Sequence, residues 1–258
     1  MALEGFLARV ASIALESLRQ DGFALGGGFA LQAHGLVDRL SDDLDAYQPK
    51  FAREPFDRGQ RSLIDQFELE GLGVVVDKEL DVFRRITVSD PTTGESAVID
   101  LGYDSRQDPP VVIAGVGPVA SPDDSVGTKA RALNDRRAAR DYFDLNAILQ
   151  KPGWSPERVY ADLQRFRHLS RESFAADLLA AHEEDPADYA AYGMSLGDMD
   201  EMFDRLAAAA EVIVDLSPGP DLGKRALAPQ GRVPKGSPGS TGGQFTTRGH
   251  SAPERPLI

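Results

Sequence analysis

The sequence predicts an α+β protein in which a mixed sheet with flanking helices is followed by a helical lobe and a disordered tail. Up to Pro118, strand-like segments rich in β-branched residues alternate with helical ones. After Pro118 the chain is rich in Ala, Arg and Leu, which favours helices. The last stretch is rich in Gly, Pro, Ser and Thr, so it cannot bury a core. We therefore expect an α/β lobe over residues 1–118, a helical lobe over 119–217 and a flexible tail over 218–258.

The first elements surround a glycine turn. Residues 3–20 place apolar side chains at helical spacing, and Gly22 ends this predicted helix. The stretch FALGGGFALQAHGL then predicts a short strand, a turn at residues 26–28 and a helix from about Phe29 to His34. Glycines in such a turn let the backbone approach a ligand closely, and a helix start offers free N–H groups to a phosphate. An ordinary tight turn would carry the same glycines.

The remaining elements of the first lobe are a helix and four strands. SDDLDAY, at residues 41–47, predicts a short strand, and residues 56–70 predict an amphipathic helix. Three more strands are predicted at 73–79, 81–89 and 95–104. The turn at 90–94, DPTTG, joins the last two strands as a hairpin.

The second lobe is predicted to consist of helices. Residues 123–150 contain no proline and predict one long helix, and further helices are expected at 155–167, 170–183 and 197–214. In the long helix, Lys129, Arg136, Arg140 and Asp144 are 7, 4 and 4 residues apart, which places them on one face. This face is either a cationic wall for a triphosphate or RNA backbone, with Asp144 orienting one cation, or a solvated stripe of salt bridges.

Composition narrows the class of protein. The chain has 258 residues, no cysteine and no apolar run long enough to span a bilayer, so we expect a cytoplasmic protein without membrane contact. The N-terminus lacks the features of a signal peptide. The formal net charge is −13, although six basic residues and one acidic residue lie from Lys224 onward. The acidic body argues against broad, non-specific binding of nucleic acid.

Two carboxylates at Asp43 and Asp45 are the strongest chemical signal. They lie two residues apart on a predicted strand, so both side chains point to the same face. Carboxylates this close repel each other unless a cation lies between them, and Mg²⁺ prefers such oxygen ligands together with substrate phosphates. A third acid on a neighbouring strand would complete the site. Asp100 is well placed for this role, and Asp104 on the same strand is the alternative. An acidic surface turn would also contain this pair.

The ordered motifs resemble a known family. GGFAL followed by RLSDDLD is similar to the glycine turn and R-x-S-x-D-[LI]-D signature of the AbiEii/MenT-like nucleotidyltransferase toxins, within the DNA-polymerase-β-like nucleotidyltransferase superfamily. KARALNDRRAARDYFDL resembles the lysine helix and R-D-x-x-D motif of the same family. The resemblance covers roughly residues 20–150 and implies a nucleotidyltransferase-type sheet. Phe29 departs from it, because the family commonly has a small hydroxyl residue there.

The resemblance also implies roles for individual residues. Asp43 and Asp45, with Asp100, would be the metal ligands for Mg²⁺ (or Mn²⁺). Asp144 would be required for activity, and Lys129 would act in NTP binding. The other positions implied in binding the NTP are Gly27, Gly28, Arg39, Ser41 and Arg140.

The resemblance implies a toxin of a toxin–antitoxin or phage-defence system that transfers NMP from an NTP to RNA, with the tRNA 3′ end as acceptor. It also implies a cognate AbiEi-like antitoxin that restrains this toxin. The residues themselves support only nucleotide transfer. A nucleotidyltransferase that modifies an aminoglycoside-like small molecule is the alternative, and the acidic charge suits a cationic acceptor better than RNA. A non-catalytic binding module is a third possibility, which the intact set of Asp43, Asp45, Lys129 and Asp144 argues against.

Overall fold

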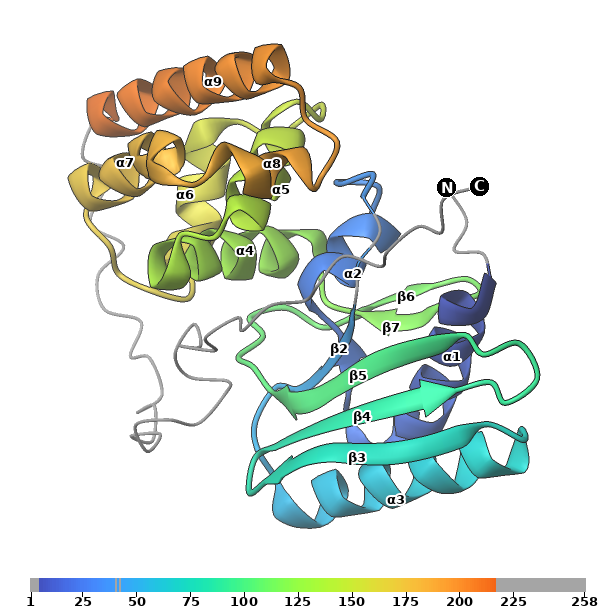
Figure 1. The fold of residues 1–258 in the computed structure, drawn as a ribbon. Coiled ribbons are helices and arrows are strands. Elements are labelled where there is room, and N and C mark those ends of the chain that lie inside the picture. The colour runs from blue at the N-terminus through green and yellow to red at the C-terminus, as the bar shows by residue number, and fades with distance from the viewer. Residues whose placement is uncertain (1–4, 40, 42, 217–258) are drawn as a thin grey trace, which may run out of the picture.

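The computed structural model describes residues 5–39, 41 and 43–216. Within them, seven strands form one sheet in the order β3-β4-β5-β2-β1-β7-β6, and a group of helices lies beside one end of it (Figure 1). This arrangement confirms the predicted α+β fold class. The strands are β1 (Ala24–Leu25), β2 (Asp43–Gln48), β3 (Gly73–Leu80), β4 (Phe83–Ser89), β5 (Ser96–Tyr103), β6 (Val111–Ile113) and β7 (Gly117–Val119).

The sheet is mixed, and its central pair carries the predicted acids. β2 runs parallel to β5, with Asp45 opposite Asp100 in the register. β3, β4 and β5 form an antiparallel meander, and β1 pairs antiparallel to β2 and parallel to β7. Because side chains alternate along a strand, Leu44 and Ala46 enter the core while Asp43 and Asp45 face the other way.

Helices α1 (Gly5–Leu18) and α3 (Arg53–Leu69) cover the apolar face of the sheet (Figure 1). Their buried side chains join those of the strands in one hydrophobic cluster, with Phe56 and Phe67 of α3 fully buried. Gly59 of α3 packs closely on α1, because a Cβ there would lie 3.1 Å from Leu18. This packing leaves the opposite face of β2 and β5 free for polar groups.

A second hydrophobic cluster holds the remaining helices together. It includes Leu31 of α2 (Gly27–Ala33), so α2 packs against the helical part as well as against the sheet (Figure 1). The division into lobes over 1–118 and 119–217 stays a prediction, and the predicted tail at 218–258 lies outside the described residues. The other helices are α4 (Pro122–Arg136), α5 (Ala139–Leu149), α6 (Pro156–Gln164), α7 (Arg171–Leu179), α8 (Pro186–Ala190) and α9 (Leu196–Asp215).

The prediction of one long helix over 123–150 was wrong. The chain leaves the helix at Arg137, whose φ of 49° is left-handed, and α5 starts at Ala139. Asp177 of α7 is buried and accepts hydrogen bonds from Arg137 at 2.7 and 3.0 Å and from Asn134 at 2.6 Å. We infer that this contact holds the break, because neither glycine nor proline is present there to end the helix.

Several shorter elements also differ from the sequence prediction. The hairpin of β6 and β7 and the five-residue helix α8 were not predicted, because so few residues give no periodic pattern. The helix expected from Phe29 begins two residues earlier, at Gly27. The helix expected over 170–183 ends at Leu179 and continues as the 3-10 turn η2 (Ala180–Glu183).

One buried acid in the helical part gives a pH-dependent stability. Burial raises the pKa of Asp162 on α6 to about 6, and Asp123 adds to the rise while Arg165 and Arg158 oppose it. The folded state then binds this proton more tightly than the unfolded state, so stability falls as pH rises from about 4 to about 6. We expect Asp162→Asn to stabilise the protein at pH 7 by about 1–3 kcal/mol and to flatten that window, measured by urea unfolding at several pH values. Equal pH profiles for the two proteins would contradict this assignment.

Candidate active site

Three carboxylates meet on the polar face of the central strands. Asp43, Asp45 and Asp100 each offer one oxygen, and these oxygens lie within 4.8 Å of one another. The arrangement follows directly from the register, since Asp45 pairs with Asp100 across parallel strands and Asp43 lies two residues before Asp45. Asp100 is buried and the other two are half-buried, so the cluster is accessible from one side.

The electrostatics of the cluster favour binding of a cation. Burial, with repulsion from Asp43, raises the pKa of Asp45 to about 7, although the hydrogen bond from Tyr47 and the charge of Arg140 oppose the rise. Burial also raises the pKa of Asp100, while Arg85 lowers it. A cation among these oxygens would remove the repulsion and stabilise the ionised forms.

Arg85 neutralises one of the three negative charges, that of Asp100. Its Nε and Nη2 donate to the two oxygens of Asp100 at 2.8 and 2.6 Å. When all three carboxylates are ionised, this pairing leaves two formal negative charges, which suits a divalent cation. Asp104, the alternative third acid, is instead 2.6 Å from Arg131 and lies outside the cluster.

The glycine turn packs directly against this cluster. Gly27 is left-handed, with φ of 57°, and a Cβ on it would overlap the carboxylate of Asp45, approaching its Cγ to 2.7 Å. A Cβ on Gly28 would lie 3.0 Å from Arg39 Nη2 and 3.0 Å from Ser41 Oγ. The glycines are therefore required for the start of α2 to lie beside the acids. Gly26 bonds the turn to β2 through its N–H, 2.8 Å from the Asp45 carbonyl oxygen.

Arg39 and Ser41 lie between the glycine turn and the helical part. Ser41 is buried beside Gly28. Arg39 donates to both oxygens of Asp144 on α5, at 2.6 and 2.7 Å, and lies 5.7 Å from the ring centre of Tyr192. Arg39 thus links the segment before β2 to α5.

A buried ion network connects α4 to α5. Lys129 Nζ lies 2.7 Å from Asp144 Oδ2 and 2.9 Å from Asp141 Oδ1, and all three side chains are buried. Arg136 donates to both oxygens of Asp141. Burial alone would raise the pKa of Asp141, but Lys129 and Arg136 outweigh it and hold the pKa well below its usual range. Lys129 and Arg136, two cations of the predicted helix face, are therefore paired with Asp141 and Asp144. This pairing forms although the predicted helix is broken into α4 and α5.

Arg140 differs from these cations. It is half-buried at the start of α5, and within the described part of the chain its side chain forms no hydrogen bond or ion pair. Its charge acts on Asp45 and lowers the pKa of that carboxyl. Arg140 is thus a cation whose charge acts on the acidic cluster.

Two residues of this site were not singled out from the sequence. Tyr47 donates to Asp45 Oδ1 at 2.6 Å, and Arg85 holds Asp100. Tyr47 could have been found from the sequence, because it lies two residues after Asp45 on the same predicted strand and so shares its face. No sequence pattern identifies Arg85, since its position opposite Asp100 depends on a strand register that the sequence does not reveal.

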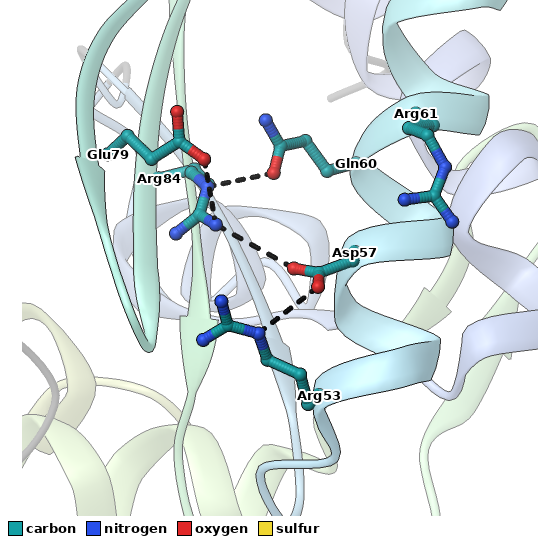
Figure 2. A pocket seen from close by; sticks show the side chains of 6 residues that line it. All are labelled: Arg53, Asp57, Gln60, Arg61, Glu79 and Arg84. Carbon is teal, nitrogen blue, oxygen red and sulfur yellow. Dashed lines mark hydrogen bonds and ion pairs between the residues drawn. The ribbon is translucent and has the colours of Figure 1, made fainter.

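A cavity of about 310 Å³ lies between α3 and strands β3 and β4 (Figure 2). Arg84 in its wall donates to Gln60 at 2.8 Å and lies 3.0 Å from Glu79 and 3.7 Å from Asp57 (Figure 2). Because Arg84 and Arg85 are neighbours on a strand, they point to opposite faces of the sheet. The contacts of Arg84 connect α3 to strands β3 and β4. This cavity therefore lies on the opposite face of the sheet from Arg85 and the carboxylate cluster.

The mixed sheet, the carboxylates on its two central strands and the adjoining glycine turn are the features expected of a nucleotidyltransferase. The family model for the nucleotidyl transferase AbiEii toxin of type IV toxin–antitoxin systems matches residues 10–212, and the chain belongs to this family. This match confirms the resemblance found in the sequence. No curated protein matches the chain.

Two solved structures show the same fold. MenT4, a nucleotidyltransferase toxin from Mycobacterium tuberculosis H37Rv, aligns with a TM-score of 0.54 and 20% identity over 82% of this chain and 84% of its own. JHP933 from Helicobacter pylori aligns with a TM-score of 0.53 and 21% identity over 82% of this chain and 93% of its own. In the described residues, no helix combines the length and the hydropathy that a membrane span requires.

Proposed function

We propose that this toxin transfers NMP from an NTP to the 3′ end of tRNA in a reaction that depends on Mg²⁺ (or Mn²⁺). The observation that carries the proposal is the cluster of Asp43, Asp45 and Asp100, whose oxygens lie within 4.8 Å of one another. Carboxylate oxygens at this separation are the ligand set that hard divalent cations take. When bound there, such a cation orients the attacking oxygen and stabilises charge on the leaving group.

The chemistry divides among the residues of the site. The acceptor hydroxyl oxygen bonds to the α-phosphorus of the NTP, and the bond from that phosphorus to the bridging oxygen breaks. Pyrophosphate leaves with the electron pair, and the hydroxyl proton passes to a carboxylate of the cluster. The acids hold the cation, so a separate positive group is needed for the phosphates.

Three features are suited to the triphosphate. The side chain of Arg140 forms no hydrogen bond or ion pair within the described residues, and its charge acts on Asp45. Gly27 and Gly28 bring the backbone close to the carboxylate of Asp45, so a triphosphate bound beside the acids would contact this turn. Arg39 and Ser41 adjoin the turn and complete its wall.

Lys129 and Asp144 have a supporting role in this proposal. Because Lys129 is bonded to both Asp141 and Asp144, it fixes α4 against α5 and so sets the position of Arg140. The family name further indicates a cognate antitoxin, for which an AbiEi-like protein is our proposal.

Label transfer tests the acceptor. The protein is incubated with Mg²⁺, total tRNA and each α-labelled NTP in turn, beside periodate-oxidised tRNA that lacks the terminal diol. We expect label on intact tRNA from one preferred NTP and none on oxidised tRNA. A parallel incubation contains a cationic aminoglycoside in place of tRNA, because the net charge of −13 suits a cationic acceptor. Label on the aminoglycoside and none on tRNA would overturn the RNA acceptor in favour of a small molecule.

A further inference from the structure

The side chain of Tyr47 contacts the three elements around the carboxylate cluster, which are β2, the glycine turn and β5. It projects from β2 on the same face as Asp43 and Asp45, and its hydroxyl donates to Asp45 Oδ1 at 2.6 Å. The other oxygen of Asp45 lies against Gly27, where a Cβ would overlap it. The carboxylate is thus held from two sides, by a hydroxyl on one oxygen and by the glycine turn on the other.

The ring of Tyr47 has almost no freedom to move. A Cβ on Gly26 would lie 2.9 Å from its Cδ2, and a Cβ on Gly102 would lie 3.2 Å from both Cδ1 and Cε1. The two edges of the ring therefore touch the glycine turn on one side and β5 on the other. Glycine at 26 and 102 leaves room for the ring, and the ring in turn fixes where its hydroxyl lies.

We propose that Tyr47 is a positioning residue that fixes the carboxylate of Asp45 for binding a divalent cation. The inference rests on the proposed metal-dependent function. A carboxylate is free to rotate about its Cβ–Cγ bond, and each orientation that misses the cation lowers affinity. A hydrogen bond from a rigid donor removes that freedom, and loss of such an outer partner costs roughly 10- to 100-fold in metal affinity.

Binding of Mn²⁺ alone tests this role without any turnover. Free Mn²⁺ is measured by electron paramagnetic resonance during titration of the full-length wild type, Tyr47→Phe, Asp43→Asn and Tyr103→Phe. Tyr47→Phe keeps the ring and removes only the hydroxyl. Tyr103 lies on β5, with its ring 6.1 Å from that of Phe51, so Tyr103→Phe is the matched control.

We expect Tyr47→Phe to raise the Mn²⁺ dissociation constant by about 10- to 100-fold, while Tyr103→Phe leaves it unchanged. The melting temperature without metal should hardly differ among these proteins, which separates positioning from a general loss of folding. Gly102→Ala, which presses on the ring from β5, is a second variant and should also weaken binding.

The outcomes separate this inference from the proposed function. If wild type and Tyr47→Phe bind Mn²⁺ equally and Asp43→Asn does not, the positioning role is overturned and the metal site stands. If the wild type binds no more Mn²⁺ than Asp43→Asn, the metal site itself is overturned, and the role of Tyr47 with it. Weak binding by Tyr47→Phe and Gly102→Ala at an unchanged melting temperature supports the proposal.

Discussion

Asp43→Asn is expected to lower the rate of nucleotide transfer by at least about 100-fold, because the amide loses one charge from the oxygen cluster. Transition-state stabilisation by a bound cation is worth several kcal/mol, and each 1.4 kcal/mol is a factor of ten in rate. The same change should leave the metal-free fold as stable as the wild type or slightly more so. Asp43 raises the pKa of Asp45 by repulsion, so its neutral replacement removes an unfavourable interaction. Single-turnover label transfer and a thermal melt measure the two effects.

Asp104→Asn is the matched control for this experiment. Asp104 lies on β5 four residues after Asp100, but it is bonded to Arg131 and lies outside the cluster. We expect it to retain most of the transfer rate, whereas Asp100→Asn should lose it. Full activity in Asp43→Asn, or a larger loss in Asp104→Asn than in Asp100→Asn, would contradict the site as assigned.

Asp144→Ala is expected to destabilise the fold by about 3–5 kcal/mol, the cost of removing one partner from a buried ion network. Asp144 is fully buried and accepts from Arg39 at 2.6 Å while lying 2.7 Å from Lys129. Its loss leaves the buried Lys129 with only Asp141 and frees Arg39 from α5. Burial alone would raise the pKa of Asp144, but Lys129 and Arg39 lower it, so this contribution is present at neutral pH and lost as pH falls below about 4.

Urea unfolding measures this loss, and Asp123→Ala provides the comparison. Asp123 pairs with Arg158 at 2.5 Å at the surface, where both side chains are about 40% exposed. Exposed pairs of this kind contribute at most about 1 kcal/mol. Equal destabilisation by Asp144→Ala and Asp123→Ala would show that the network does not hold α4 and α5 together.

The sequence reveals the carboxylates because period-two alternation on a strand is a local property. Asp43 and Asp45 share a face wherever β2 pairs, so their proximity is predictable from spacing alone. Asp100 lies beside them only because β2 and β5 are parallel neighbours with Asp45 opposite Asp100. That register is a property of the tertiary structure and cannot be read from local spacing. The alternation of strand-like and helical segments predicted the fold class, and the resemblance to the family, which the family model confirms, implied the nucleotidyltransferase-type sheet without that register.

The features that the sequence did not reveal depend on distant contacts. The break between α4 and α5 coincides with the contact of Arg137 with Asp177, which is 40 residues away. Helix propensity over 123–150 gives no sign of it, since tertiary contacts override propensity. The pairing of Arg85 with Asp100 is equally distant from any local pattern. The glycines were identified, but their crowding against Asp45 becomes visible only in three dimensions.

A titration of Mg²⁺ against the rate of label transfer tests the central claim most directly. The wild type and Asp43→Asn are stripped of metal with EDTA, and transfer from the preferred α-labelled NTP is followed as Mg²⁺ is added back. We predict no transfer in EDTA, a saturable return of activity in the wild type and a flat response in Asp43→Asn. Transfer at full rate in EDTA, or the same Mg²⁺ response in both proteins, would contradict a cation-binding active site at Asp43, Asp45 and Asp100.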